Sequence, residues 1–108
     1  MNERSLFILQ RISAALLAPL VIAHLVLILV AVNQGLSAEE ILGRTRSNYF
    51  WGGFYLLFVL SVSVHAPIGL RNILREWTSL HPRWINGGCL LLAVAFLLLG
   101  LRAVAAVI

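Results

Sequence analysis

Charged residues are scarce in this chain. Only 11% of its 108 residues are Asp, Glu, Lys or Arg, whereas 61% are hydrophobic. A soluble domain is about one quarter charged, and a globule of this length has too small an interior to remove so much apolar surface from water. The composition therefore excludes an ordinary soluble domain and predicts that lipid surrounds most of the chain.

Cysteine is nearly absent, and no glycine-rich phosphate loop is present. The one cysteine, Cys89, lies in an apolar run, which excludes an intramolecular disulfide and favours a small residue packed against another helix. The chain also lacks the cysteine set of an iron–sulfur cluster and the loop motif that holds the phosphates of FAD. The chain therefore has no sequence signature of its own for binding an iron–sulfur cluster or FAD.

Three apolar segments are long enough to cross a bilayer, at residues 13–32, 50–74 and 85–108. About 20 helical residues at 1.5 Å each cover the roughly 30 Å hydrocarbon core. Polar connectors separate the segments, and in the first connector Ser37 and Glu40 form a capping-box pattern that predicts a short surface helix. The predicted fold is all-α: one integral membrane domain, residues 1–108, with three transmembrane helices.

Lysine is absent, and all eight basic residues are arginines. They occur singly at segment ends, which argues against a nucleic-acid site. Five lie on the side of the N-terminus and second connector (Arg4, Arg11, Arg71, Arg75 and Arg83), and three on the other side (Arg44, Arg46 and Arg102). This excess predicts a cytoplasmic N-terminus, in a bacterial inner (plasma) membrane.

Several polar side chains fall inside the predicted spans: Arg11, Ser13, His24, Ser61, Ser63, His65 and Arg71. Such groups are costly in lipid and usually face another helix, a cavity or a cofactor. Three helices are too few to bury them all, so the sequence predicts a composite helical bundle completed by partner subunits. The spans contain no Asp or Glu for ion coupling, which disfavours a transporter.

The most informative segment surrounds His65. A neutral imidazole inside a helical bundle is the usual axial ligand of a b-type haem, and Gly69, one turn away on the same face, leaves room for a flat group. Arg71 lies about 9 Å further along the helix, where it could pair with a haem propionate or with lipid headgroups. Pro67 removes a helical hydrogen bond and predicts a local bend. The alternative is that His65 only hydrogen-bonds a neighbouring helix.

Other candidate site residues lie near the same end of the spans. Arg11 and Ser13 could position a carbonyl oxygen of a bound ligand; alternatively, Arg11 reaches lipid phosphate and Ser13 bonds its own backbone. Trp77 could contact the ring of such a ligand or anchor at the interface. His24, roughly 20 Å deeper than Arg11, is a second candidate haem ligand, or it hydrogen-bonds a partner helix.

The second span resembles a known family. The pattern His65-x-x-x-Gly69-Leu70-Arg71, with Glu76 eleven residues after the histidine, is similar to the second helix of the larger cytochrome b anchor subunit of succinate dehydrogenase. In that family the histidine is a haem b ligand and an acidic residue stands at the position of Glu76. The resemblance therefore implies haem b on His65, with Glu76 beside a quinone site.

The first span adds to this resemblance. Residues 10–14, Gln-Arg-Ile-Ser-Ala, resemble the family's His-Arg-x-Ser-Gly motif, whose arginine lines the quinone pocket. This implies that Arg11 and Ser13 contact ubiquinone or menaquinone. The chain departs from the family at Gln10 and Ala14, at Phe7 in place of a serine, and at Glu76 in place of aspartate. Residues 11–19 also resemble the smaller anchor subunit, so which of the two anchor subunits this chain corresponds to stays open.

The resemblance implies a membrane-anchor subunit of a succinate dehydrogenase type complex of the respiratory chain and tricarboxylic acid cycle. Its partners would be a flavoprotein, an iron–sulfur subunit and a sibling anchor. The chain itself would carry no dicarboxylate chemistry and would pass electrons to quinone with a b-type haem. In the two-haem relatives, histidines of the first helix also ligate haem, which implies this role for His24. The competing interpretation is a haem-free accessory or assembly subunit in which His24 and His65 make only interhelical hydrogen bonds.

Overall fold

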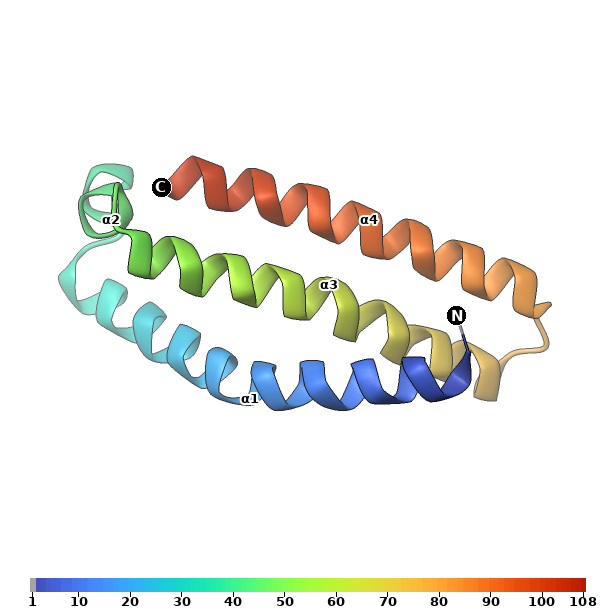
Figure 1. Ribbon diagram of the computed structural model, residues 1–108. Helices are drawn as coiled ribbons and strands as arrows, with labels where there is room; N and C mark the ends of the chain where they lie inside the picture. Colours follow the sequence, from blue (N-terminus) through green and yellow to red (C-terminus); the bar gives the residue numbers. More distant parts are fainter. Residues whose placement is uncertain (1) are drawn as a thin grey trace.

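The computed structural model describes residues 2–108. Four helices follow one another along the chain: α1 (Glu3–Gln34), α2 (Ala38–Thr45), α3 (Tyr49–Trp77) and α4 (Pro82–Val107). The three long helices lie side by side with α3 in the middle, and the short α2 lies across one end beside the C-terminus (Figure 1). No strand occurs in the described part of the chain. The predicted all-α class is confirmed.

Each long helix is long and apolar enough to span a membrane. They contain 32, 29 and 26 residues, and at about 1.5 Å per residue each exceeds the roughly 30 Å hydrocarbon core. All three extend beyond the apolar spans of the sequence; α1 begins at Glu3 rather than at residue 13. A helix continues through polar residues at headgroup level because its backbone hydrogen bonds stay satisfied, whereas hydropathy marks only the apolar centre.

Side-chain caps fix where the helices begin. The Asn2 carboxamide oxygen accepts from the backbone N–H of Ser5 at 2.8 Å and starts α1. Asn48 caps α3 in the same way, and the exposed His81 caps α4, its Nδ1 accepting from the N–H of Arg83 at 3.1 Å. Each cap satisfies one of the N–H groups that a first helical turn leaves unpaired.

The short helix predicted from Ser37 and Glu40 is present as α2. The Ser37 hydroxyl accepts from the backbone N–H of Glu40 at 3.1 Å and donates to its carboxylate at 2.8 Å. Arg44 donates to the carbonyl of Gly35 at 2.8 Å, and the buried Thr45 donates to the carbonyl of Val107 at 2.6 Å. These two bonds attach α2 to the ends of α1 and α4.

The buried residues are nearly as often polar as apolar. Six apolar residues are buried (Leu17, Pro67, Ile68, Ile85, Cys89 and Val104), as are five polar or charged ones (Ser13, Thr45, Ser61, Ser63 and Arg71). Large apolar side chains instead cover the outside. A soluble protein places these groups the other way round, so the distribution fits a bundle in lipid.

Small residues bring α3 and α4 together. A Cβ added at Gly100 would lie 2.4 Å from Cγ1 of Val59, so the two helices are in contact there through the glycine backbone. Both internal prolines lie within unbroken helices, Pro19 in α1 and Pro67 in α3. The ribbon of α1 visibly changes direction part-way along (Figure 1). The helix α3 continues as one helix through Pro67.

Candidate functional site

Ser13 and His65 meet where α1 packs on α3. The Ser13 hydroxyl is buried, donates to the carbonyl of Gln10 at 3.0 Å, and lies 3.3 Å from Nδ1 of His65. A hydroxyl has one proton, so when the Gln10 carbonyl accepts it, the oxygen is an acceptor for the imidazole tautomer that carries Nδ1–H. That tautomer leaves Nε2 unprotonated, with a lone pair available to a metal or to a donor.

Gly69 lies one turn beyond His65 and faces the same helix. A Cβ added there would lie 3.5 Å from the amide nitrogen of Gln10, an ordinary contact distance. The amide oxygen of Gln10 is buried and has no hydrogen-bond partner among residues 2–108. Buried polar atoms are normally satisfied, so this oxygen marks a place where a donor outside the described chain fits. The Gln10 side chain therefore occupies part of the space that the sequence predicted beside His65.

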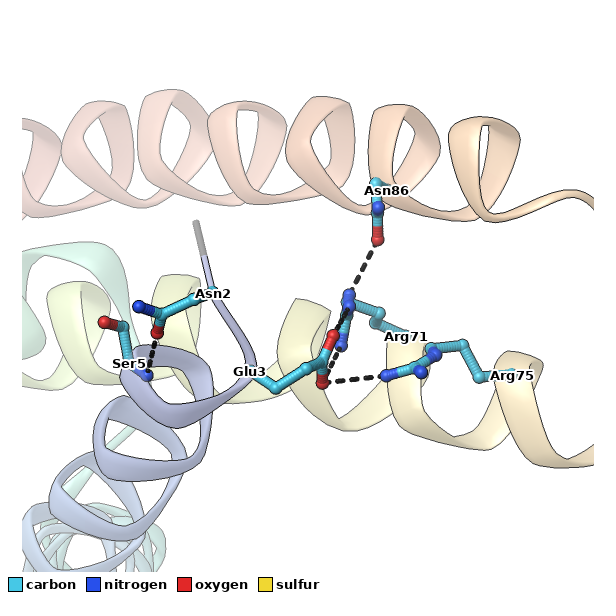
Figure 2. A network of polar contacts seen from close by, with 6 residues as sticks. All are labelled: Asn2, Glu3, Ser5, Arg71, Arg75 and Asn86. Carbon is cyan, nitrogen blue, oxygen red and sulfur yellow. Dashed lines mark hydrogen bonds and ion pairs between the residues drawn. The ribbon is translucent and has the colours of Figure 1, made fainter.

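Arg71 is buried and fully engaged by neighbouring helices. Its Nε donates to the side-chain oxygen of Asn86 at 2.7 Å, and its two terminal nitrogens hold the carboxylate of Glu3 at 2.5 and 3.3 Å. Arg75 donates to the same carboxylate at 2.8 Å (Figure 2). The network joins the ends of α1, α3 and α4. The sequence predicted a propionate or headgroup for Arg71 and missed Glu3, which stood outside the predicted first span.

Arg71 and His65 do not point the same way from α3. Six residues separate them, which at about 100° per residue places their side chains roughly 120° apart around the helix. His65 meets α1 at Ser13, whereas Arg71 reaches Asn86 on α4 as well as Glu3. Of the residues expected at the haem, Gly69 accompanies His65, and Arg71 forms a separate network.

His24 lies at a different depth from His65. Its ring packs against Phe58, with centroids 5.1 Å apart, and meets the ring of Tyr55 edge-on at 6.4 Å. Its Nδ1 is buried without a hydrogen-bond partner among the described residues. Because Phe58 precedes His65 by seven residues on α3, the two imidazoles are separated by about 10 Å along the helix. They do not converge on one point.

The remaining predicted quinone residues are on the outside of the bundle. Arg11 is exposed, with its guanidinium carbon 5.8 Å from the centre of the Phe7 ring. Glu76 and Trp77 are exposed at the end of α3, Trp77 at 81%. Within residues 2–108, no ion pair or side-chain hydrogen bond joins these three residues to one another. Only Ser13 of the predicted quinone set faces the interior.

No group of three or more His, Cys, Asp or Glu side chains surrounds a common point in the described part of the chain. An axial haem ligand is a single imidazole and needs no such group. Among residues 2–108, the imidazoles of His65 and His24 each have a ring nitrogen without a hydrogen-bond partner. The half-buried His65 fits an axial role as it stands, whereas the unpaired Nδ1 of His24 is covered by its neighbours.

Comparison with protein families identifies the chain. The family model described as "Succinate dehydrogenase/Fumarate reductase transmembrane subunit" matches residues 3–102. The chain belongs to this family. The match covers α1, α2, α3 and most of α4, and so includes both the Ser13–His65 contact and the Arg71 network. No curated protein and no solved structure matches the chain.

Family membership makes the chain a membrane subunit of a succinate dehydrogenase or fumarate reductase. It implies association with the catalytic subunits of such a complex and with the membrane. The family in general binds haem and quinone. The resemblance noted in the sequence is therefore confirmed at the level of the family.

Proposed function

We propose that the chain anchors a succinate:quinone oxidoreductase type complex in the bacterial inner membrane and carries a b-type haem on His65. A flavoprotein and an iron–sulfur subunit would dock at the end formed by the N-terminus and the α3–α4 connection, on the cytoplasmic side. A sibling anchor would complete the bundle. The observation that carries the proposal is the Ser13–His65 hydrogen bond, which leaves Nε2 free inside the membrane.

His65 would hold the haem iron through Nε2. Ser13 fixes the ring by accepting from Nδ1–H, the kind of outer hydrogen bond that sets the orientation and basicity of a ligating imidazole. Gly69 leaves the adjoining turn without a side chain. Arg71 is held by Glu3 and Asn86 on a different face of α3 and takes no part in this proposal. When bound, the haem supplies one-electron transfer between the iron–sulfur subunit and quinone.

His24 is the second ligand position that we propose. Its buried Nδ1 has no partner, and its depth differs from that of His65 by about 10 Å, so the two histidines would serve different irons. The second ligand of the His65 haem would then come from the sibling anchor. The haem-to-flavin ratio of the complex tests this: a ratio of one that survives His24→Leu would leave His24 a packing residue.

The quinone site that we propose lies at the same end of the bundle as the docking surface. Arg11 is exposed two residues before Ser13, and Glu76 and Trp77 are exposed where α3 ends. An exposed cation, carboxylate and indole at that level are available to a partner subunit and to a ubiquinone or menaquinone ring between the chains. Arg11 would stabilise the quinone oxygen that gains charge on reduction.

Reduced-minus-oxidised visible spectra of the purified complex test the haem. We expect b-type absorption in the wild type and its loss in His65→Ala. The matched control is His81→Asn, which removes the exposed histidine and keeps a side chain that caps α4; its spectrum should equal that of the wild type. A complex without b-type absorption, or one whose haem survives His65→Ala, would overturn the assignment in favour of a haem-free accessory subunit.

Turnover with quinone tests the second site. Arg11→Ala should lower succinate-dependent quinone reduction and leave reduction of a water-soluble acceptor unchanged, because the soluble acceptor takes electrons before the quinone. Arg102→Ala, an exposed arginine near the other end of the bundle, is the control. Equal quinone turnover in the two variants would remove Arg11 from the proposed site.

A further inference from the structure

A groove of about 350 Å³ lies between α1, α3 and α4. It is separate from the haem and quinone positions proposed above, because neither His65 nor Arg11 lines it. Its walls are apolar over most of their area, with Leu6, Leu9, Val64, Pro67, Leu90 and Ala93 among the lining residues. The groove exists because α1 and α4 pack against α3 rather than against each other.

The groove is elongated along the helices. On α3 its lining begins at Ser63 and ends at Arg71, eight residues further on, which corresponds to about 12 Å. On α4 it extends from Asn86 to Ala93. An open apolar groove that follows the helix axes can accept a hydrocarbon chain lying parallel to them.

One end of the groove, the end nearer the α3–α4 connection, is polar and positive. Arg71 and Asn86 line it, and Arg75 stands one turn further along α3 (Figure 2). Two arginines share the single carboxylate of Glu3, so the network keeps one net positive charge. The side chain of Arg75 is 44% exposed and gives only one of its N–H groups to Glu3, and the Asn86 amide nitrogen is also a donor.

We propose that this groove binds one anionic phospholipid, with its phosphate at Arg75 and Asn86 and one acyl chain along α3. Basic pockets between transmembrane helices are general sites for anionic headgroups. The charge at the rim is complementary to a phosphate, and the apolar channel below it is complementary to an acyl chain. Such a lipid would contact all three long helices. The inference is independent of the haem and quinone and requires only that the chain lies in a membrane.

Ser63 distinguishes a bound phospholipid from the competing occupant, a quinone-like ring. Its hydroxyl lies at the deep end of the groove, is buried and has no partner among residues 2–108. Pro67 has no N–H to offer the Ser63 carbonyl, so the helix lacks one of its regular hydrogen bonds at this level. A quinone-like ring would hydrogen-bond there, whereas an acyl chain would not. The length of the groove and its charged rim favour the lipid.

The experiment uses the whole complex, delipidated in detergent and then exposed to vesicles of phosphatidylglycerol or of phosphatidylcholine. Native mass spectrometry counts the phospholipids retained per complex. We expect the wild type to retain one more phosphatidylglycerol than the Ala93→Phe variant, whose ring fills the groove. Arg75→Gln should weaken phosphatidylglycerol retention about fivefold, the effect of one arginine near the membrane surface. The b-type spectrum should be the same in all variants.

Two controls complete the design. Arg102→Gln removes a positive charge away from the groove, and Ser63→Ala removes only the deep hydroxyl; both should retain phosphatidylglycerol as the wild type does. Equal retention of the two lipids, or equal retention by wild type, Arg75→Gln and Ala93→Phe, would overturn the proposal. Loss of the bound species in Ser63→Ala would also overturn it and assign the groove to a hydrogen-bonding ring. If Ala93→Phe fails to assemble, Arg75→Gln against Arg102→Gln decides.

Discussion

The Ser13 hydroxyl and Nδ1 of His65 lie 3.3 Å apart, although 52 residues separate them in the sequence. This contact crosses from α1 to α3 and favours the Nδ1–H tautomer of the imidazole when the hydroxyl proton is given to Gln10. Both residues were candidates from the sequence, but for different ligands. In their contact Ser13 lies against the histidine, and the quinone site that we propose is left to the exposed residues around Arg11.

Ser13→Ala should therefore change the haem potential rather than the haem content. Without its acceptor, the imidazole is a weaker base and stabilises the ferric form less. We expect a higher midpoint potential, by on the order of tens of mV, the scale of one lost hydrogen bond. A redox titration of the purified complex measures it. Ser13→Thr keeps the hydroxyl and should titrate as the wild type does; an unchanged potential in Ser13→Ala would contradict this role.

Hydropathy predicted the three spans, and the Ser37 and Glu40 pattern predicted α2. Which face of each helix packs against its neighbours was not predictable in the same way. In a soluble helix an apolar stripe marks the buried face, but in lipid the outward face is apolar too, so no stripe distinguishes the partner side. The contact of Ser13 with His65 depends on how α1 and α3 are rotated about their own axes. The Glu3–Arg71 pair joins residues 68 apart and depends in addition on α1 extending to Glu3.

Arg71→Ala should destabilise the complex much more than Arg75→Ala. The side chain of Arg71 is 9% exposed and is bonded to both Glu3 and Asn86, so its removal leaves a cavity and an unpaired amide oxygen. Arg75 is 44% exposed and makes one bond. We expect the melting temperature to fall by about 5 °C for Arg71→Ala and by less than about 2 °C for Arg75→Ala. Similar shifts in thermal unfolding would show that burial of Arg71 contributes little.

Gly100→Ala should weaken the packing of α3 on α4. The new methyl group would lie 2.4 Å from Cγ1 of Val59, a stiff β-branched side chain. Overpacking of about 1–3 kcal/mol exceeds the roughly 1 kcal/mol that alanine gains over glycine in a helix. Thermal unfolding should show a net loss that the double variant Val59→Ala/Gly100→Ala restores. Gly87→Ala, where no atom lies within 4 Å of the added Cβ, should be neutral or stabilising.

Gly35→Ala should disrupt the turn between α1 and α2. Gly35 has φ +132°, a conformation that residues with a side chain rarely adopt, and its carbonyl accepts from Arg44. A Cβ added there would also overlap the carboxylate of Glu40, which holds the cap of α2. The strain of about 1–3 kcal/mol should lower the melting temperature and increase proteolysis between α1 and α2. Gly43→Ala on α2, where an added Cβ meets nothing within 4 Å, is the matched control. If both variants were cut at the wild-type rate, the Gly35 conformation would not be needed to hold α2 in place.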